Sequence, residues 1–190
     1  MNRKKFQTAT EGKLPEQPML GLVDPLVVKN TRFSEDRKHR YTLFRHWGDP
    51  SHFCAFVGMN PSGADEAEID RTVNRCIEFA KDWGYGAFYM LNAFSLRETD
   101  SAALIKSNDR VRSKNDFWIK KIASTAPRVV AAWGKRGATG GRGEEVEEIL
   151  LNTCESHRVF CFGRNKDGSP KHPLYQPKDS PLVPFLHLQS

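Results

Sequence analysis

Residues 53–62, FCAFVGMNPS, constrain the fold more than any other stretch of the chain. The first five, 53–57, are aromatic, β-branched or small and carry no charge, which predicts a strand buried on both faces. Gly58 allows the chain to turn, and Pro61 cannot continue a strand and keeps the preceding residue out of the helical region. An ordinary exit from strand to loop would look the same, but open α/β sheets also bind ligands just beyond the carboxyl ends of their strands. The side chains placed there belong to Met59, Asn60 and Ser62.

Three more largely apolar runs follow, the last two of which begin with an arginine, and helical patterns separate them. The runs at 87–91, 128–133 and 158–162 predict further buried strands. Strands that alternate with helices through right-handed crossovers form a parallel sheet with helices on both faces. We therefore predict the α/β class, as a three-layer αβα sandwich around a central four-stranded parallel sheet whose carboxyl ends meet at one edge. The expected helices are 71–82 with Asp70 as N-cap, 109–124, and one that begins at about Glu144.

The first 40 residues differ from the remainder in composition. Residues 1–40 form a basic, polar arm and an edge segment, with a short strand expected at 26–28 and a charged surface loop at 31–40. Residues 41–190 are predicted to form a single domain, which starts with an antiparallel edge strand at 41–47. The tail from residue 172 is rich in proline, so we expect it to be irregular.

Charge and cysteine content restrict the partners and the compartment. The chain of 190 residues has 29 lysines and arginines against 23 acids, a net charge of +6. This excess suits an anionic partner such as a nucleic acid, although ordinary surface charge also explains it. The four cysteines include no C-x-x-C pair, so we expect buried, reduced thiols, no metal cluster and a cytoplasmic protein. No apolar run is long enough to predict a membrane span.

Four short stretches occur at the predicted strand ends. They are Gly58-Met-Asn-Pro-Ser62, Met90-Leu-Asn-Ala-Phe94, Ala132-Trp-Gly-Lys-Arg136 and Lys171-His-Pro-Leu-Tyr175. Together, over residues 41–185, they resemble the uracil-DNA glycosylase superfamily. The first is similar to the Gly-x-Asn-Pro-Gly motif of the mismatch-specific and thymine glycosylase branch, and the second to the Leu-Leu-Asn-Ala segment of the uracil-specific branch. The third is similar to the shared Trp-Gly strand end, and the fourth to the His-Pro-Ser motif.

A second resemblance points to a narrower group within that superfamily. Asn60-Pro-Ser62, Arg75-Cys76, Trp83-Gly-Tyr-Gly86 and residues 166–175 are similar to a bacterial domain family of uncharacterised function. The superfamily resemblance implies the uracil-DNA-glycosylase-like fold and a monofunctional DNA glycosylase. Such an enzyme flips a pyrimidine out of DNA, hydrolyses its N-glycosidic bond and leaves an abasic site. It needs no cofactor and no metal, and we expect a monomer whose partner is DNA.

The resemblance assigns the catalytic roles. Asn60 would position the attacking water, and His172 would donate a hydrogen bond to the charge that develops on the departing base. An amide cannot deprotonate water, so catalysis would depend on orientation and on stabilisation of the leaving group. The carboxylate that other branches carry beside the asparagine motif is missing here. Asp65 or Asp70 could replace it, although a surface-loop acid and a helix N-cap are their simpler interpretations.

The same resemblance assigns base recognition. Asn92 would bind the edge of the base, because its amide offers an acceptor and two donors, and it could instead cap the strand exit. Phe94 would stack on the base or pack in the core. Met59 and Tyr175 complete the expected pocket.

DNA contacts are expected from hydroxyl and basic side chains at this edge. The glycine-rich run 134–143 lacks the spacing of a nucleotide-binding P-loop, so its cations are assigned to DNA phosphates instead. Leu174 stands where the family motif has a serine, which removes one expected phosphate contact. Leu182 is one candidate for the side chain that wedges into the duplex. The predicted DNA-binding residues are Ser62, Lys135, Arg136, Arg164, Lys166 and Lys171.

Three alternatives to an ordinary repair glycosylase stay open. Two asparagines without a matching carboxylate suit a modified or damaged pyrimidine, and a hypermodified phage cytosine would give the enzyme a role in defence. The missing carboxylate and Leu174 also fit a non-catalytic DNA-binding module of the same fold. An N-glycosidase acting on free nucleosides or nucleotides is the third possibility.

Overall fold

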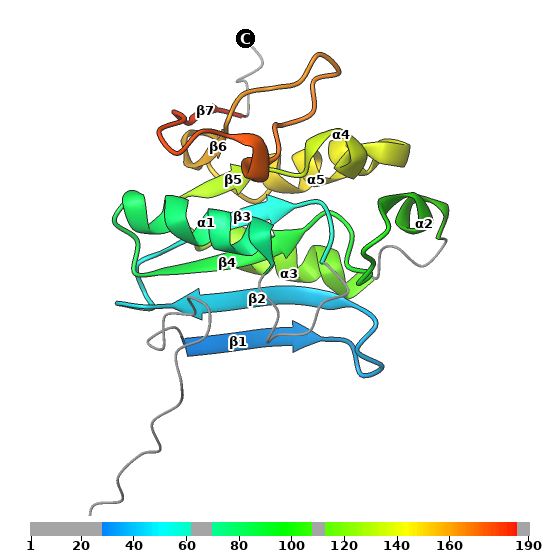
Figure 1. The fold of residues 1–190 in the computed structure, drawn as a ribbon, viewed down its shortest axis with the longest axis horizontal. Coiled ribbons are helices and arrows are strands. Elements are labelled where there is room, and N and C mark those ends of the chain that lie inside the picture. The colour runs from blue at the N-terminus through cyan, green and yellow to red at the C-terminus, as the bar shows by residue number, and fades with distance from the viewer. Residues whose placement is uncertain (1–27, 62–69, 108–112, 186–190) are drawn as a thin grey trace, which may run out of the picture.

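The structure, a computed structural model, describes residues 28–61, 70–107 and 113–185. Its centre is a seven-stranded mixed sheet with the order β1-β2-β4-β3-β5-β6-β7, and Figure 1 shows these strands stacked from β1 at the bottom to β7 at the top. The α/β class predicted from the sequence is therefore confirmed. The strands are β1 (Val28–Phe33), β2 (Arg40–His46), β3 (Phe53–Gly58), β4 (Ala87–Asn92), β5 (Val129–Ala131), β6 (Val159–Cys161) and β7 (Val183–Pro184).

Four neighbouring strands, β4, β3, β5 and β6, pair in parallel, as the uncharged runs predicted. The prediction was incomplete, because antiparallel strands extend this parallel group on both sides. The chain runs from β3 outward to β4 and then crosses back to β5 on the far side of β3. The direction of winding thus reverses between β3 and β5, where sheets of this kind bind their ligands.

Helices cover both faces of the sheet. On one face α1 (Arg71–Asp82) packs on side chains of β3 and β4 that include Phe56 and Phe88. On the other face α3 (Ser113–Ala123) and α5 (Arg142–Leu151) pack over Val57 and Leu91. The remaining helical segments are α2 (Ser101–Lys106), α4 (Gly134–Gly137), η1 (Thr139–Gly141), η2 (Ser156–Arg158) and η3 (Pro173–Tyr175).

Helix α1 has the bounds that its sequence predicted. The Asp70 side chain accepts hydrogen bonds from the Thr72 and Val73 N–H groups at 2.8 and 3.2 Å, which satisfies two of the free donors of the first turn. Helix α3 covers Ser113–Ala123 of the predicted range 109–124, and residues 109–112 of that range lie outside the described residues. The short α2 was not predicted, since six residues carry too little periodicity to be recognised.

The edges of the sheet differ most from the sequence expectations. Thr31, Arg32 and Phe33 were predicted to lie in a loop but belong to β1, in which residues 29–32 are all polar, as an edge strand allows. Strand β2 is antiparallel as predicted, but it lies between β1 and β4 and is not an edge. Residues 28–40 thus belong to the same sheet as the main domain. The earlier part of the predicted arm, 1–27, lies outside the described residues.

Candidate functional site

The exits of β3 and β4 run side by side at the carboxyl edge of the parallel strands. The Ala93 N–H donates to the Gly58 carbonyl, and the Phe94 N–H donates to the Met59 carbonyl, both at 2.9 Å. A Cβ atom on Gly58 would lie 3.2 Å from the Asn92 Oδ1 atom, tighter than most contacts of real Cβ atoms. Glycine at this position therefore leaves the space that the Asn92 amide occupies.

The Asn60 side chain is held by two backbone carbonyls. Its Nδ2 donates to the Pro61 oxygen at 2.9 Å and to the Glu98 oxygen at 2.6 Å. Both partners are acceptors, so they fix which end of the amide is the NH₂ group. The Oδ1 atom accepts no hydrogen bond from the part of the chain that the structure describes, and Asn60 is only half-buried. Asn60 therefore presents an oriented acceptor of the kind that binds a water O–H.

Asn92 ends β4 and is fully buried, with 0% exposure. Neither Nδ2 nor Oδ1 has a hydrogen-bond partner among the described residues. An unpaired buried amide costs about 1–3 kcal/mol per polar group, and native proteins leave few such groups. The backbone around it is well satisfied, because the Asn115 Nδ2 donates to the Asn92 carbonyl at 2.9 Å. The unpaired state thus belongs to the side chain alone, which marks it as a candidate ligand-binding group.

His172 caps η3 and is partly buried beside the exit of β5. Its Nδ1 accepts a hydrogen bond of 3.3 Å from the Leu174 N–H, so the neutral ring carries its proton on Nε2. Burial lowers the pKa of His172, and the nearby Asp70 carboxylate opposes this effect less strongly. Gly134, at a φ of +67°, makes room for the histidine, because a Cβ on it would lie 3.3 Å from the His172 Cβ. At neutral pH His172 is therefore an uncharged hydrogen-bond donor.

Asp70 serves as the N-cap of α1, which was the simpler of its two interpretations. One of its carboxylate oxygens is used by the two backbone donors of the first turn. The negative charge of the Asp70 carboxylate acts to raise the pKa of His172, against the larger effect of burial. The other candidate acid, Asp65, and the predicted DNA contact Ser62 lie outside the described residues.

The remaining candidates for base recognition differ in how exposed their side chains are. Phe94 has 0% exposure and lies in the core beneath α3 and α5, which was its alternative interpretation. Met59 is half-buried and packs against the same cluster. Tyr175 is 78% exposed, and its ring centroid lies 5.6 Å from that of His172. The exposed ring beside the histidine is therefore Tyr175.

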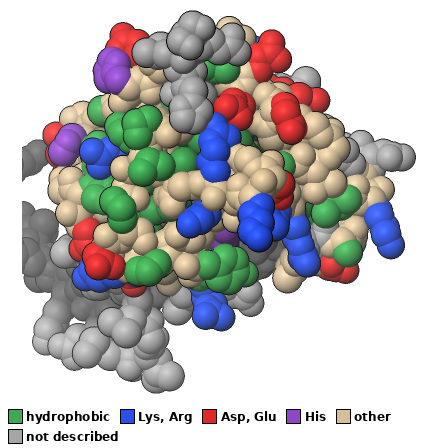
Figure 2. All heavy atoms as spheres, turned by 90° about the horizontal axis from the view of Figure 1, so that it is seen from above, with side chains coloured by type: hydrophobic (Ala, Val, Ile, Leu, Met, Phe, Trp, Pro, Cys, Tyr) green, Lys and Arg blue, Asp and Glu red, His purple; other side chains and the backbone are tan. Residues whose placement is uncertain are grey.

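Basic side chains surround the histidine loop. Figure 2 looks onto the end of the molecule formed by β6, β7 and η3 and shows several Lys and Arg side chains close together there. Exposed cations in this region come from α4 and from the loop after β6. Their sequence positions suit contacts with phosphates at the carboxyl edge. They are Lys135, Arg136, Lys166 and Lys171.

Arg164 differs from the other predicted DNA contacts. Its Nη1 donates to the Gly168 carbonyl at 2.7 Å, and its Nη2 donates to the Phe185 carbonyl at 2.7 Å and to the Glu147 carboxylate at 3.2 Å. The guanidinium also lies 4.1 Å from the centroid of the Phe185 ring. These contacts tie the loop after β6 to α5 and to β7, so Arg164 holds the loop in place.

Two buried residues that support the site were not singled out in the sequence. Arg142 is 3% exposed; its Nε donates to the Ala93 carbonyl at 2.7 Å, and it forms ion pairs with Asp116 and Glu145. Asn115, on α3, holds the neighbouring carbonyl of Asn92. Arg142 follows a glycine pair in a segment that resembles an exposed loop, so the sequence carries no sign of its burial.

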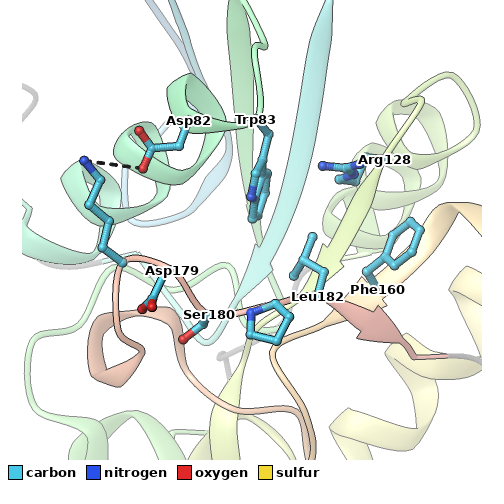
Figure 3. A pocket seen from close by; sticks show the side chains of 9 residues that line it. Asp82, Trp83, Arg128, Phe160, Asp179, Ser180 and Leu182 are labelled. Atoms are coloured by element: carbon cyan, nitrogen blue, oxygen red, sulfur yellow. Dashed lines mark ion pairs between the residues drawn. The ribbon is translucent and has the colours of Figure 1, made fainter.

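A hollow of about 660 Å³ lies at the opposite edge, near the amino ends of the strands (Figure 3). Trp83 and Arg128 point into it, and Lys178 pairs with Asp82 at 3.7 Å on its rim. Leu182, the candidate wedge residue, lines this hollow and packs against the α1 side of the core. The lining of this hollow includes Leu182 but not Asn60, Asn92 or His172.

The described residues include no group of three or more His, Cys, Asp and Glu side chains placed to hold a metal ion. None of the described helices combines the length and the apolar character that crossing a bilayer requires. All four cysteines are buried and free of disulfide bonds, as predicted.

Fold and site together define a mixed α/β protein whose candidate polar side chains lie beyond the ends of its parallel strands. Residues 40–174 match a family described as a protein of unknown function (DUF1643). Because the match covers well over half of the chain, the protein belongs to this family. No curated protein and no solved structure matches the chain. The family match runs from the start of β2 into η3 and includes Asn60, Asn92 and His172.

Proposed function

We propose that the protein is a DNA glycosylase that excises a modified or damaged pyrimidine and leaves an abasic site. The observation that carries the proposal is the Asn92 amide, which is fully buried at the end of β4 with no hydrogen-bond partner among the described residues. An amide offers the donors and the acceptor that the polar edge of a pyrimidine requires. A flipped base that pairs with Asn92 would satisfy a group that is otherwise held at a free-energy cost.

The leaving group would be stabilised by His172. As the C1′–N bond breaks, its electron pair moves onto the base, and negative charge develops on a base carbonyl oxygen. The Nε2–H of the neutral imidazole is the free donor of this ring, since Nδ1 already binds the Leu174 N–H. A fixed donor aimed at developing charge is an effective form of catalysis because it needs no reorganisation. The lowered pKa of His172 keeps the ring in this neutral form.

The nucleophile would be a water bound to Asn60. The Oδ1 atom would accept a hydrogen bond from an O–H group of the water. The Pro61 and Glu98 carbonyls hold the amide in one orientation. The water oxygen bonds to C1′ as the base departs, and the excess proton passes to solvent. Because an amide is no base, rate acceleration would come from position and from the leaving group. This favours bases that already leave easily.

The experiment is a glycosylase assay with alkali treatment to cleave abasic sites. The substrates are DNAs that carry uracil, a thymine mismatch, a hydroxymethyl-pyrimidine or glycosylated hydroxymethylcytosine. We expect cleavage of at least one DNA by the wild-type protein, strong loss in Asn60→Ala and His172→Ala, and no loss in the control Lys178→Ala at the opposite edge. Preference for the glycosylated cytosine would support a role in defence, and preference for uracil would support repair.

One observation favours a second function, a non-catalytic DNA-binding module. Backbone carbonyls bind both N–H groups of the Asn60 amide, and Asn92 has no exposed surface. Both observations suit residues that have a structural role and no role in catalysis. In that case the assay would give no abasic sites on any DNA while binding to DNA persists. Binding that free nucleotides abolish, with little dependence on salt, would instead identify a nucleotide N-glycosidase.

A further inference from the structure

A second hollow lies between α3 and the two N-terminal strands, and its lining is unusually uniform. Its volume is about 450 Å³, and every side chain that lines it is aromatic or basic. It contains no acidic and no aliphatic residue, although acids make up 23 of the 190 residues of the chain. The lining residues are Arg32, Phe33, Tyr41, Lys114, Phe117 and Trp118. We call this hollow the aromatic groove.

The aromatic groove lies at the same edge of the sheet as the candidate active site. Leu43 of β2 pairs with Met90 of β4 in antiparallel register, so the first residues of β2 lie beside the carboxyl end of β4. From the other side, α3 is fixed to that same end, because Asn115 donates to the carbonyls of Asn92 at 2.9 Å and Ala93 at 3.3 Å. Lys114 and Phe117 therefore lie near the backbone of Asn92.

An irregularity in the sheet explains how Tyr41 reaches the groove. The pairing of β1 with β2 shifts at this point, since Arg32 is opposite Thr42 and Phe33 is opposite Arg40. The register between the two strands therefore skips Tyr41, which is the arrangement of a β-bulge. Bulges redirect side chains, and Tyr41 lines the groove together with side chains of α3.

The charges around the groove are positive. Arg32 and Lys114 are exposed, and their side chains form no ion pair or hydrogen bond with another described residue. The Lys121 ammonium lies 5.2 Å from the Trp118 ring centroid and 5.7 Å from that of Phe117. The nearest acid on α3, Asp116, is bound by Arg142. Anions would thus meet cations that no neighbouring carboxylate neutralises.

The aromatic surface is accessible to a ligand. Phe117 is 56% exposed, and its ring lies 5.4 Å from that of Trp118, edge to face. Phe33 is half-buried, with the Arg37 guanidinium 4.2 Å from its centroid. Exposed rings beside cations are typical of surfaces that bind single-stranded nucleic acid, because unpaired bases stack on the rings while phosphates contact the cations.

We infer that the aromatic groove binds single-stranded DNA on one side of the excised base. Bases that flank the target would stack on Phe117 and Trp118, and their phosphates would contact Arg32 and Lys114. Bases in a duplex are stacked on one another and cannot enter such a groove. The inference rests on the proposed glycosylase function and names its substrate class, which is DNA with an unpaired stretch.

The test compares binding of labelled single-stranded oligo-dT and of a duplex of equal length by fluorescence anisotropy. We expect tighter binding of the single strand and about 10-fold weaker binding in Phe117→Ala, in line with the cost of losing one stacked base. Lys114→Ala should lower the slope of log K against log salt by about 0.7, the value for one phosphate on a single strand. The controls are Lys120→Ala, a lysine on the same helix outside the groove, and Leu151→Ala, an exposed residue on α5.

The outcomes separate this inference from the proposed function. Abasic-site formation with unchanged single-strand binding in Phe117→Ala and Lys114→Ala would overturn the inference and leave the glycosylase standing. Groove-dependent binding of oligo-dT without any abasic sites would uphold the groove and refute the glycosylase. Equal binding of duplex and single strand would contradict the inference. So would self-association that Phe117→Ala abolishes with no change in DNA binding, because the groove would then join two copies of the chain.

Discussion

The two ends of the parallel strands use polar side chains in different ways. At the amino end, Arg128 lies 5.2–5.5 Å from the ring centroids of Trp83, Tyr85 and Phe160, and the Cys54 thiol is buried. Figure 3 shows Trp83, Arg128 and Phe160 around the hollow at this end. At the carboxyl end, the Asn92 amide is buried without a partner among the described residues. The Arg128 guanidinium at the amino end is thus packed among rings, whereas polar atoms at the carboxyl end, the Asn92 amide among them, have no partner among the described residues. We propose from this difference that the amino end serves stability and the carboxyl end serves binding.

The largest expected effect is on catalysis at the carboxyl end. His172→Ala removes the Nε2–H donor, and loss of one donor to developing charge typically lowers kcat by about 100-fold or more. His172→Gln, which keeps an N–H donor, should recover part of the rate. Abasic sites formed per minute measure both variants, and unchanged rates in both would remove His172 from the mechanism.

Substitutions at the amino end of the strands should change the stability of the protein and not its activity. Arg128→Ala loses cation–π contacts with three rings, and we expect the free energy of unfolding to fall by about 1–2 kcal/mol. Arg128→Lys, which keeps the charge, should lose less. Urea denaturation measures the change. If the folded Arg128→Ala variant cleaved DNA more slowly than the wild type, the amino end would contribute to activity as well, contrary to the proposal.

The pH dependence of stability and activity tests the role of His172 at the carboxyl end. Burial places the pKa of His172 below its ordinary value of about 6.5, so the ring stays neutral to a lower pH in the folded protein than in the unfolded chain. The unfolded chain then binds the proton first, and this contribution to stability is present above pH 6.5 and declines as the pH falls. Activity should persist below pH 6.5 and decline at lower pH. His172→Gln should lack this decline, and a wild-type decline already above pH 6.5 would contradict the burial effect.

The smallest expected effect concerns the cysteine beneath Arg128. Burial raises the pKa of the Cys54 thiol to about 12, and the Arg128 charge reduces this shift only in part. A thiol reagent at pH 8 should therefore leave Cys54 unmodified in the folded protein and modify it after denaturation. Mass spectrometry of digested samples distinguishes the states. Rapid labelling without unfolding would show that this end of the sheet opens.

The sequence predicted the regular centre of the fold because its signals are local. Strands β3 to β6 appear as uncharged runs, and α1 combines the N-cap Asp70 with apolar residues at helical spacing. Strand β7 has two exposed residues, and only its pairing with β6 makes it a strand. The assignment of Thr31–Phe33 to a loop failed for a similar reason, since pairing with β2 outweighs their polar character.

The candidate site could be predicted in position but not in detail. Sequence motifs located Asn60 and Asn92 at strand exits, where the structure places them, whereas His172 lies at the start of η3, well beyond the end of β6. Whether a polar side chain is paired depends on residues far apart in the chain. Arg164 was assigned to DNA but binds Phe185 and Glu147, and Arg142 is buried although its surroundings in the sequence are polar.

The central claim is that Asn92 is kept unpaired for a ligand, and one pair of readouts on Asn92→Leu tests it most directly. Leucine has a similar shape and no polar atoms, so the cost of the unpaired amide disappears. The account predicts an unchanged or higher free energy of unfolding in urea together with loss of abasic-site formation. A clear loss of stability with cleavage retained would contradict it, because Asn92 would then be a structural residue.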